Sequence, residues 1–352
     1  MIGLLENPTP EALAGFEAIL DVRSPAEFAQ DHVPGAMNLP VLDDAERAMI
    51  GTLYVQESRF RARREGAALV ARNIARHLEN GLAGRAASFA PLVYCWRGGQ
   101  RSHAMATVLD QVGWRPTLIA GGYRTWRRQV NGALYDTDLA HRLVLLDGPT
   151  GLAKTAILAA VGDAGGQIID LEGLAAHRGS LFGAYPGRPQ PSQKMFESRL
   201  FAILAAADPA RPILVEAESS KIGEIVNPPA LWKAMQAAPR IVLDAPALAR
   251  ARYLLEAYGD ITHDRDALDA IIARLPRHHG KDRREAWRAL VAAGELETLA
   301  LELMAEHYDP AYARSGAGEG ERRVLAGLTL DDLGPAARAA AAGRIAQIME
   351  SL

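Results

Sequence analysis

The chain has 352 residues, 49% of them hydrophobic and 23% charged, with a formal net charge of −3 at pH 7. This length corresponds to about two domains of a soluble globular protein. A single cysteine, Cys95, excludes a disulfide framework. No apolar run reaches the ~18 residues of a membrane span, and the acidic N-terminal segment does not resemble a signal peptide. We therefore expect a cytoplasmic protein with no membrane partner.

The first part of the chain alternates between strand-like and helix-like patterns. Predicted strands lie at 18–22, 92–94 and 117–119, and helical patterns lie at 65–80 and 101–112. Such alternation favours a mostly parallel sheet with helices on its faces. We therefore expect an α/β domain over residues 1–135.

A second series of strands and helices follows. Predicted strands lie at 143–146, 167–170, 213–216 and 240–244, and helical patterns lie at 154–161, 192–206 and 229–237. This predicts a second α/β domain over residues 141–250. Strand signals stop at about 247, so we expect residues 251–352 to form a helical region packed on that domain, with a glycine-rich loop at 316–320.

Cys95 lies where an apolar strand turns into a helical pattern. The turn contains Trp96, Arg97, Gly98, Gly99, Gln100 and Arg101. Backbone N–H groups and the positive end of a helix favour the thiolate form of such a cysteine, and the two arginines add positive charge. A cysteine and arginine spaced in this way occur in both phosphatases and sulfur-transfer enzymes, but phosphatases usually place histidine before the cysteine, where this chain has Tyr94.

Three ordered motifs around this cysteine resemble the rhodanese family. They are DVRSPAEF at 21–28, HVPGAMN at 32–38 and the Gly121-Gly122 turn. The resemblance covers about 120 residues. It implies a rhodanese-like fold in which the Cys95 thiolate carries or attacks a chalcogen.

A second loop joins the strand at 143–146 to the next helical pattern. Gly148, Lys154 and Thr155 fit the phosphate-binding pattern G-x-x-x-x-G-K-[ST], but Ala153 stands where glycine is expected. We expect the alanine to permit the turn if its φ stays negative. The pattern does not identify the ligand, because any diphosphate ester satisfies the same cradle of N–H groups and lysine.

Acidic side chains follow neighbouring strands of the second domain. Asp170 follows one strand, and Glu216 and Glu218 lie at the end of another. Such carboxylates can hold Mg²⁺ or orient a substrate, and solvated loop acids are the alternative. Arg250 and Arg252 further along resemble the lid entry of small P-loop kinases, where arginines meet phosphates.

Two segments are basic although the whole chain is acidic. Residues 57–77 and 274–288 each carry six basic and two acidic residues, a net charge of +4. Such segments suit contact with a phosphate backbone, and a solvated helix face is the alternative. The tRNA-contacting residues that we predict are Arg59, Arg61, Arg63, Arg64, Lys281, Arg283 and Arg284.

The combination of a rhodanese-like and a P-loop region on one chain resembles the tRNA 2-selenouridine synthase family. The motifs that carry this resemblance lie at 95–102, 148–155, 171–180, 190–197 and 215–219. The resemblance implies S-geranylation of 2-thiouridine at the tRNA wobble position by geranyl diphosphate, followed by exchange of the geranylthio group for selenium from selenophosphate. It also implies a selenophosphate-supplying enzyme as partner, no tightly bound cofactor, and Mg²⁺ as an optional ion.

Carried onto this sequence, the resemblance divides the candidate residues between the two steps. Cys95, with the loop residues Trp96 to Arg101, serves the selenium step. The diphosphate-binding residues are Gly148, Thr150, Gly151, Lys154 and Thr155, and the possible substrate or Mg²⁺ residues are Asp170, His177, Arg178, Glu216 and Glu218. Two other interpretations of the function stay open: a sulfurtransferase coupled to an ATP-binding kinase-like domain, and a non-catalytic sensor of a phosphate ligand.

Overall fold

The computed structural model describes residues 1–180, 182–275, 279–316 and 322–352. Contacts divide the chain into two compact units: unit 1 comprises Met1–Thr137 and Pro191–Ala206, and unit 2 comprises Asp138–Gln190 and Ala207–Leu352. The predicted loop at 316–320, except Gly316, lies outside the described residues, as do residues 276–278 of the second basic segment.

Unit 1 is built on a five-stranded parallel sheet with strand order β1-β5-β4-β2-β3. The strands are β1 (Gly3–Leu5), β2 (Ile19–Asp21), β3 (Met37–Asn38), β4 (Leu92–Tyr94) and β5 (Thr117–Ile119). The predicted strands at 18–22, 92–94 and 117–119 are confirmed. Strands β1 and β3 were not predicted, because they have three and two residues and no continuous buried run.

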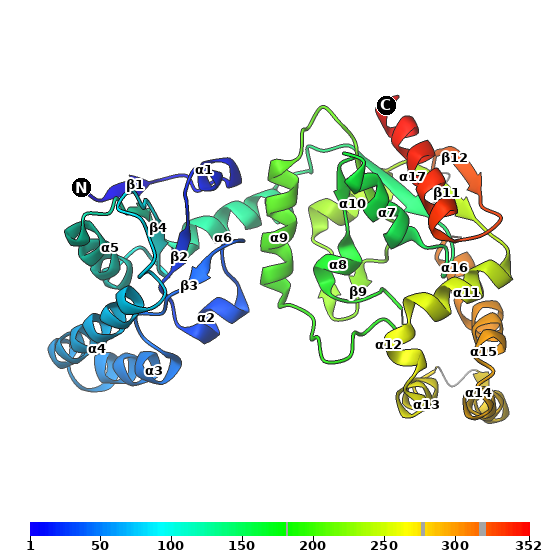
Figure 1. Cartoon of the computed structure of the whole chain (residues 1–352), viewed down its shortest axis with the longest axis horizontal. Helices are drawn as coiled ribbons and strands as arrows, with labels where there is room; N and C mark the ends of the chain where they lie inside the picture. Colours follow the sequence, from blue (N-terminus) through cyan, green and yellow to red (C-terminus); the bar gives the residue numbers. More distant parts are fainter. Residues whose placement is uncertain (181, 276–278, 317–321) are drawn as a thin grey trace. The chain divides into compact units, whose positions relative to one another are not determined.

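Helices surround this sheet (Figure 1). They are α1 (Pro10–Ala14), α2 (Pro25–Gln30), α3 (Asp44–Thr52), the π-helical turn η1 (Leu53–Glu57), α4 (Arg59–Glu79), α5 (Gln100–Val112), α6 (Tyr123–Asn131), the π-helical turn η2 (Gly132–Asp136) and α9 (Gln193–Ala206). Local signals begin several of them: Ser24 and Glu27 form a capping box at α2, and Ser58 caps α4. Buried Leu20 and Val93 of the sheet pack in the core with Met105 of α5.

Helix α9 belongs to unit 1, although it lies between two strands of unit 2 in the sequence. We expected the helix at 192–206 to be part of a continuous domain over residues 141–250. Its contacts instead place this segment in unit 1. The Trp126 indole donates a hydrogen bond to the Ser198 hydroxyl at 3.1 Å, and Ser198 donates to Asp31 at 3.0 Å. These buried polar partners come from α6 and the loop after α2, and a local helical pattern carries no information about them.

Unit 2 contains a second five-stranded parallel sheet, with strand order β12-β11-β6-β8-β7. The strands are β6 (Leu143–Asp147), β7 (Ile168–Ile169), β8 (Ile213–Glu216), β11 (Arg240–Asp244) and β12 (Val324–Thr329). Our expectation that strands stop at about 247 was wrong, because β12 pairs with β11 at the sheet edge. Only Leu328 of β12 is buried, so this strand lacks an apolar run.

The remaining elements of unit 2 are mostly helices. They are α7 (Lys154–Asp163), α8 (Leu171–Ala175), the hairpin strands β9 (Lys221–Ile222) and β10 (Ile225–Val226), α10 (Pro229–Ala237), α11 (Ala247–Ala257), α12 (Gly259–Thr262), α13 (Arg265–Ala273), α14 (Lys281–Ala293), α15 (Leu296–Leu303), the π-helical turn η4 (Met304–Tyr308), α16 (Asp309–Gly316) and α17 (Pro335–Glu350). The sheet, α7 and α17 share one hydrophobic core, and α13, α14 and α15 share another.

The expected fold class is confirmed: two α/β regions with parallel sheets and a largely helical C-terminal region (Figure 1). Among the helices of the described residues, none combines the length and apolar character needed to cross a membrane.

Candidate functional sites

The Cys95 side chain lies at the end of the central strand β4, just before α5. It is 3% exposed, and its Sγ accepts a hydrogen bond from the backbone N–H of Gly99 at 3.3 Å. The Ser102 hydroxyl lies 3.2 Å from the same sulfur. The loop therefore aims an N–H group at the sulfur from the start of a helix, an arrangement that stabilises negative charge there.

The Gly121-Gly122 turn packs against the backbone of the cysteine loop. A Cβ atom on Gly122, whose φ is +62°, would lie 2.2 Å from the Cys95 carbonyl oxygen and 2.5 Å from the Gly98 nitrogen. The next residue, Tyr123, donates its backbone N–H to the Cys95 carbonyl at 2.8 Å. This position must be glycine because the two backbone segments are in direct contact.

The two arginines of the loop differ in their surroundings. Arg97 is exposed. Arg101 donates to the Glu27 carboxylate at 2.7 Å. Burial opposes ionisation of Glu27, but the Arg101 hydrogen bond and charge outweigh it and lower the pKa of Glu27. Half of the positive charge expected around Cys95 is therefore already balanced within the protein.

The D-V-R motif is a buried scaffold beneath this loop. The Arg23 guanidinium donates to Asp21 at 2.6 Å and to the Asp31 carbonyl at 2.6 Å. It also lies 4.0 Å from the centre of the Tyr123 ring. Asn38, from the second motif, donates to the carbonyls of Asp21 and Arg23 at 3.1 and 3.0 Å. These residues position the backbone that carries Cys95.

The phosphate-type loop connects the central strand β6 to α7 in unit 2. Gly148 and Gly151 have φ values of +143° and +87°. Ala153 has a φ of +55°, so the turn forms without the negative φ that we had taken as its condition. The Ala153 methyl group is 3% exposed and belongs to the core under the sheet. Burial of this methyl group offsets part of the cost of the left-handed conformation.

The polar side chains of this loop have partners within the protein. Lys154 Nζ donates to the carbonyls of Gly148 and Pro149 at 2.7 and 3.2 Å, which folds the ammonium group over the loop. Thr155 donates its hydroxyl to Glu172 at 2.9 Å. An incoming phosphate would compete for both donors, as expected of a cradle that binds anions.

Carboxyl groups gather beside Lys154 and Thr155, because parallel strands bring their carboxyl ends to one edge. Burial, and then the nearby Glu218 charge, raises the pKa of Glu172 to about 8. Burial also raises the pKa values of Glu216 and Glu218. Asp170 accepts a hydrogen bond from the Gly173 N–H at 2.7 Å and caps α8. Glu172 was not among the predicted site residues, although it lies two residues after Asp170.

Gly179 lies directly against the carboxylates of Glu172 and Glu218. A Cβ atom there would lie 2.6 Å from Glu218 and 2.9 Å from Glu172. The neighbouring His177 accepts the Gly179 N–H through Nδ1 at 3.2 Å. Burial, and then the Arg178 charge, lowers the pKa of His177. His177 therefore shapes this turn as a neutral imidazole.

Arg178 lines the cavity above the phosphate-type loop. Its guanidinium lies 4.1 Å from the Tyr185 ring and 4.6 Å from the Tyr258 ring, and it donates to Asp260 at 2.8 Å. Its Nη1 is buried without a hydrogen-bond partner among the described residues. A buried donor of this kind costs free energy unless a ligand or water satisfies it, so Arg178 suits an anionic ligand.

The predicted lid arginines are engaged elsewhere. Arg250 is buried, donates to the Thr150 carbonyl at 2.8 Å and forms an ion pair with Asp309 at 2.6 Å. Arg252 donates to Glu297 at 3.0 Å. Arg250 thus braces the phosphate-type loop through its backbone.

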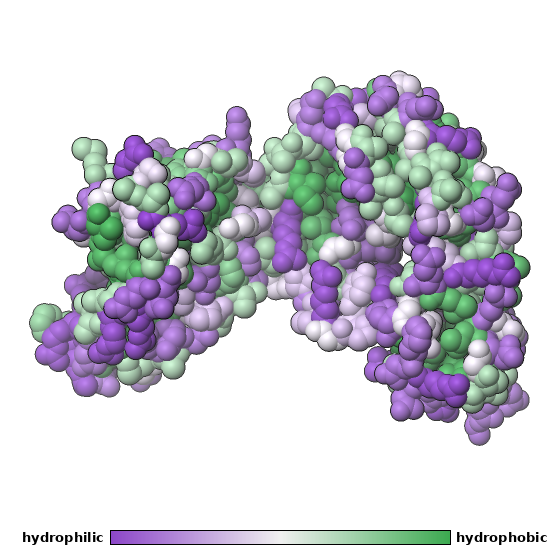
Figure 2. Space-filling model, viewed as in Figure 1, coloured by the Kyte–Doolittle hydropathy of each residue, from purple (hydrophilic) through white to green (hydrophobic). Residues whose placement is uncertain are grey.

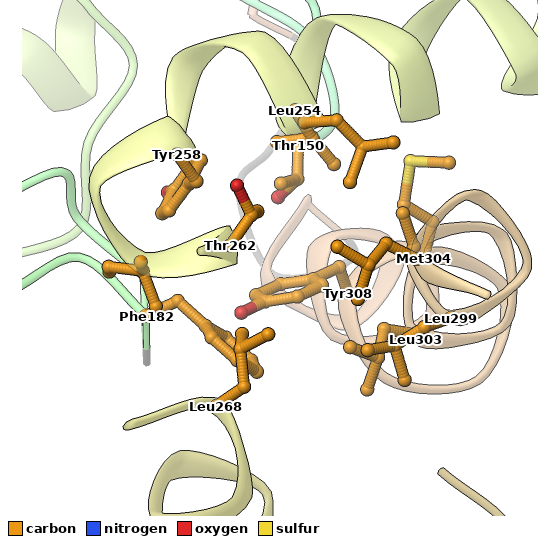
Figure 3. Close-up of a pocket in the computed structure, with 14 residues that line it drawn as sticks. Thr150, Phe182, Leu254, Tyr258, Thr262, Leu268, Leu299, Leu303, Met304 and Tyr308 are labelled. Carbon is orange, nitrogen blue, oxygen red and sulfur yellow. The ribbon is translucent and has the colours of Figure 1, made fainter. Parts of the chain in front are cut away.

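An apolar cavity adjoins this phosphate-type cavity within unit 2. The two cavities share Thr150, Leu254, Tyr258 and Tyr308. Figure 3 shows the Tyr308 ring among the hydrophobic side chains, with Thr150 beside Leu254. Figure 2 shows hydrophobic side chains near α11 and α15 bordered by hydrophilic ones. This cavity was not predicted from the sequence, because its lining residues are spread from 150 to 308.

The predicted tRNA-contacting residues differ in their partners. Arg59, Arg61, Arg63 and Arg64 are exposed on α4. Arg61 lies between Glu57 and Glu65, with distances of 2.9 and 2.7 Å. On α14, Lys281 pairs with Glu285, Arg283 pairs with Glu302 and Glu306, and Arg284 donates to the Gly280 carbonyl. Contact with tRNA stays a prediction for both groups.

Curated relatives match the chain over most of its length. A protein from Chromohalobacter salexigens named tRNA 2-selenouridine synthase is 33% identical over 334 residues, covering 88% of this chain and 90% of that protein. The chain belongs to the tRNA 2-selenouridine synthase family. Another member, from Alcanivorax borkumensis, is 34% identical over 340 residues, covering 88% of this chain and 90% of its own length. A member from Nitrosomonas europaea is 33% identical over 68% of this chain and 63% of its own length.

Two family models match separate parts of the chain. The tRNA 2-selenouridine synthase AAA domain matches residues 141–270, and the rhodanese-like domain matches residues 9–129. The matched ranges contain the phosphate-type loop and Cys95, respectively. Family membership thus agrees with the two motif groups recognised in the sequence.

Proposed function

We propose that this chain converts wobble 2-thiouridine of tRNA into 2-selenouridine in two steps, S-geranylation followed by selenium transfer. Family membership supports the overall conversion, since the relatives are named for it. The observation that carries the first step is the apolar cavity beside the phosphate-type loop. A nucleotide needs no such cavity, whereas an isoprenoid diphosphate needs both an anion cradle and an apolar pocket.

In this proposal the diphosphate lies over Gly148, Gly151 and the N-terminus of α7. Lys154 and the unpartnered Nη1 of Arg178 then bind its oxygens. The thiocarbonyl sulfur attacks C1 of the geranyl group, the S–C1 bond forms, and the C1–O bond breaks with its electron pair on diphosphate. The N3 proton of the base is released to water. Positive groups aimed at the leaving diphosphate stabilise the charge that develops there.

Mg²⁺, the optional ion, would bind at this loop together with the diphosphate. Among the described residues no group of three or more His, Cys, Asp or Glu side chains could hold a metal ion. Mg²⁺ commonly binds through one or two protein oxygens together with substrate phosphates and waters. Thr155 and Glu172 would supply such oxygens, and the ion would neutralise charge on the leaving group.

Cys95 serves the second step in this proposal. Its thiolate attacks the phosphorus of selenophosphate, so that an S–P bond forms and the P–Se bond breaks with its electron pair on selenium. The selenide then attacks C2 of the geranylated base, and geranylthiolate leaves and takes up a proton. Water later releases phosphate from the cysteine. Arg97 and the backbone N–H groups of the loop hold the phosphoryl oxygens, and a selenophosphate-supplying enzyme provides the donor.

Nucleoside mass spectrometry of thiolated tRNA tests the two steps together. Wild type, Cys95→Ala and Lys154→Ala are incubated with geranyl diphosphate, with and without selenophosphate. We expect Cys95→Ala to retain geranylation and lose selenation, and Lys154→Ala to lose geranylation. Loss of geranylation in Cys95→Ala would contradict the division. No product with wild type and both donors would overturn the synthase proposal and favour a sulfurtransferase or a sensor.

A further variant tests the apolar cavity directly. Leu299→Trp places a larger side chain in the cavity, so we expect the KM for geranyl diphosphate to rise. Competitive inhibition by inorganic pyrophosphate, which needs only the cradle, should stay as in wild type and serves as the control for folding. An unchanged KM would exclude this cavity as the geranyl site.

A further inference from the structure

We propose that a groove on unit 1, between the α3–η1–α4 segment and the start of α5, binds unpaired nucleotides of the RNA substrate. This inference rests on the proposed function, because it assumes that the substrate is RNA. It assigns that RNA a place beside the cysteine loop, which neither the family comparison nor the sequence does.

The groove is formed by a helical insertion between β3 and β4. Its lining includes Ile50 of α3, Tyr54 of η1, Gly66 of α4 and Gln100 of α5. Gln100 is the first residue of α5 and directly follows Gly99, which donates its N–H to the Cys95 sulfur. The groove therefore reaches the start of α5, which directly follows the loop that carries Cys95.

The charge of the lining suits a polyanion. Arg47, Arg63 and Arg101 line the groove, and no aspartate or glutamate does so. Arg101 is paired with Glu27. Arg47 and Arg63 form no ion pair within the part of the chain that the structure describes. The Arg47 charge also acts on the Glu27 carboxylate, more weakly than that of Arg101, so Arg63 is the less compensated of the two. Two guanidinium groups outside ion pairs on one groove are a site for backbone phosphates.

Exposed rings and apolar side chains lie beside these arginines. Tyr54 lines the groove and is 42% exposed, and the nearby Val55 and Phe60 are 81% and 75% exposed. The Arg59 guanidinium lies 5.6 Å from the centre of the Tyr54 ring. All of them belong to the π-helical turn η1 and the first turn of α4, and such π-helical turns are frequent at functional sites.

This combination fits a single-stranded nucleic acid. Proteins bind unpaired nucleotides by stacking bases on aromatic rings and arginine planes, and by contacting phosphates with basic side chains. Tyr54 with Arg59 forms a stacking surface, and Arg47 with Arg63 provides the phosphate contacts. The exposed bases of a tRNA anticodon loop have the required chemistry.

Binding of a fluorescent anticodon stem-loop RNA that contains 2-thiouridine tests the proposal. Fluorescence anisotropy would give the Kd of the full-length protein at several KCl concentrations. We expect Tyr54→Ala to raise the Kd by about 5- to 150-fold, as for one lost base stack. Tyr54→Trp should restore binding. Arg63→Ala should reduce the slope of log K against log[salt] by about 1.

Arg72→Ala is the matched control. Arg72 is exposed on the same helix, α4, but does not line the groove, and the substitution removes the same charge. We expect the Arg72→Ala Kd and salt slope to equal those of wild type, and pyrophosphate inhibition of geranylation to be unchanged in all of the variants.

The outcomes separate this inference from the proposed function. If wild type modifies and binds the RNA, and Tyr54→Ala and Arg63→Ala bind it equally well, the groove assignment is overturned while the proposed function stands. If wild type neither modifies nor binds the RNA, both fail. Equal losses in Arg63→Ala and Arg72→Ala would show diffuse electrostatic attraction and would also overturn the groove.

Discussion

At the scale of single residues, backbone conformation at the two loops is as informative as side-chain chemistry. Ala153 adopts the left-handed conformation that glycine normally supplies in a phosphate-type loop. Gly122 lies so close to Cys95 and Gly98 that no side chain fits. One position thus tolerates a methyl group, because its side chain is buried in the core, and the other does not.

We expect Ala153→Gly to change the free energy of unfolding by less than about 1 kcal/mol. Relief of the left-handed conformation gains about 1–2 kcal/mol. Loss of a buried methyl group costs ~0.8 kcal/mol, and the more flexible unfolded chain costs about 0.4–1 kcal/mol. Urea denaturation measures the difference. A stabilisation above about 1 kcal/mol would show that the methyl group contributes less to the core than its burial implies.

Gly122→Ala should strongly disrupt the cysteine loop. The new Cβ atom would lie 2.2 Å from the Cys95 carbonyl, in addition to the strain of a φ of +62°. Gly113→Ala is the matched control, because its φ is +103° and nothing lies within 4 Å of its Cβ position. We expect a thermal melt to show a loss for Gly122→Ala several kcal/mol larger than for Gly113→Ala. Equal losses would attribute the whole effect to backbone strain.

At the scale of elements, the parallel sheet of unit 2 brings acidic side chains together. Asp147, Glu216 and Asp244 end three adjacent strands. Helix α8 adds Glu172, which accepts the Thr155 hydroxyl. Glu172 lies beside Lys154, and burial together with neighbouring carboxylates raises the pKa values of Glu172 and Glu216. A cradle for an anion thus borders carboxyl groups that favour the neutral form.

This cluster predicts a pH dependence of stability. Because the pKa of Glu172 is raised to about 8 in the folded state, the folded protein binds more protons than the unfolded chain between about pH 4.5 and that value. The stabilisation that Glu172 contributes to the folded state is fully present below its unfolded-state pKa. It is lost as the pH rises toward 8. We expect Glu172→Gln to flatten this decline in urea denaturation at pH 5 to 8. A decline as steep as in wild type would locate the effect in other groups.

At the scale of the whole molecule, the chain passes between the two units three times, at residues 137–138, 190–191 and 206–207. Helix α9 is the segment that returns to unit 1. Buried Glu197 of this helix forms an ion pair with Arg127 and accepts the Tyr135 hydroxyl at 2.5 Å. The Gln-Pro-Ser motif at 190–192 therefore leads into a helix that completes the rhodanese-like unit.

We expect Glu197→Ala to destabilise unit 1 by about 1–3 kcal/mol, because Arg127 and Tyr135 lose their shared acceptor. Arg127 keeps the Lys194 carbonyl and Asp31 as partners, at 3.2 and 3.8 Å. Glu197→Gln, which keeps an acceptor for Tyr135, should cost less. Scanning calorimetry with pyrophosphate present measures this, since the ligand stabilises unit 2 by mass action. An Ala variant that lowers only the pyrophosphate-sensitive transition would contradict the assignment of α9 to unit 1.

Patterns within short segments of the sequence were enough to predict much of this protein. The apolar runs at 92–94 and 143–146 are the central strands β4 and β6, and the loops after them carry Cys95 and Lys154. Both loops follow from local rules, since a strand, a glycine-containing turn and a helix start are adjacent in the sequence. The resemblance to tRNA 2-selenouridine synthases rested on the same segments.

The tertiary structure alone decided which distant residues meet. Hydrogen bonding and burial partners placed α9 in unit 1 and paired β12 with β11, although neither segment shows this in its own pattern. Glu172 meets Lys154 and Glu218 only through the parallel sheet, and the apolar cavity joins residues more than 150 positions apart. Local sequence determines backbone preference and periodicity, whereas long-range packing determines contacts, burial and therefore pKa values.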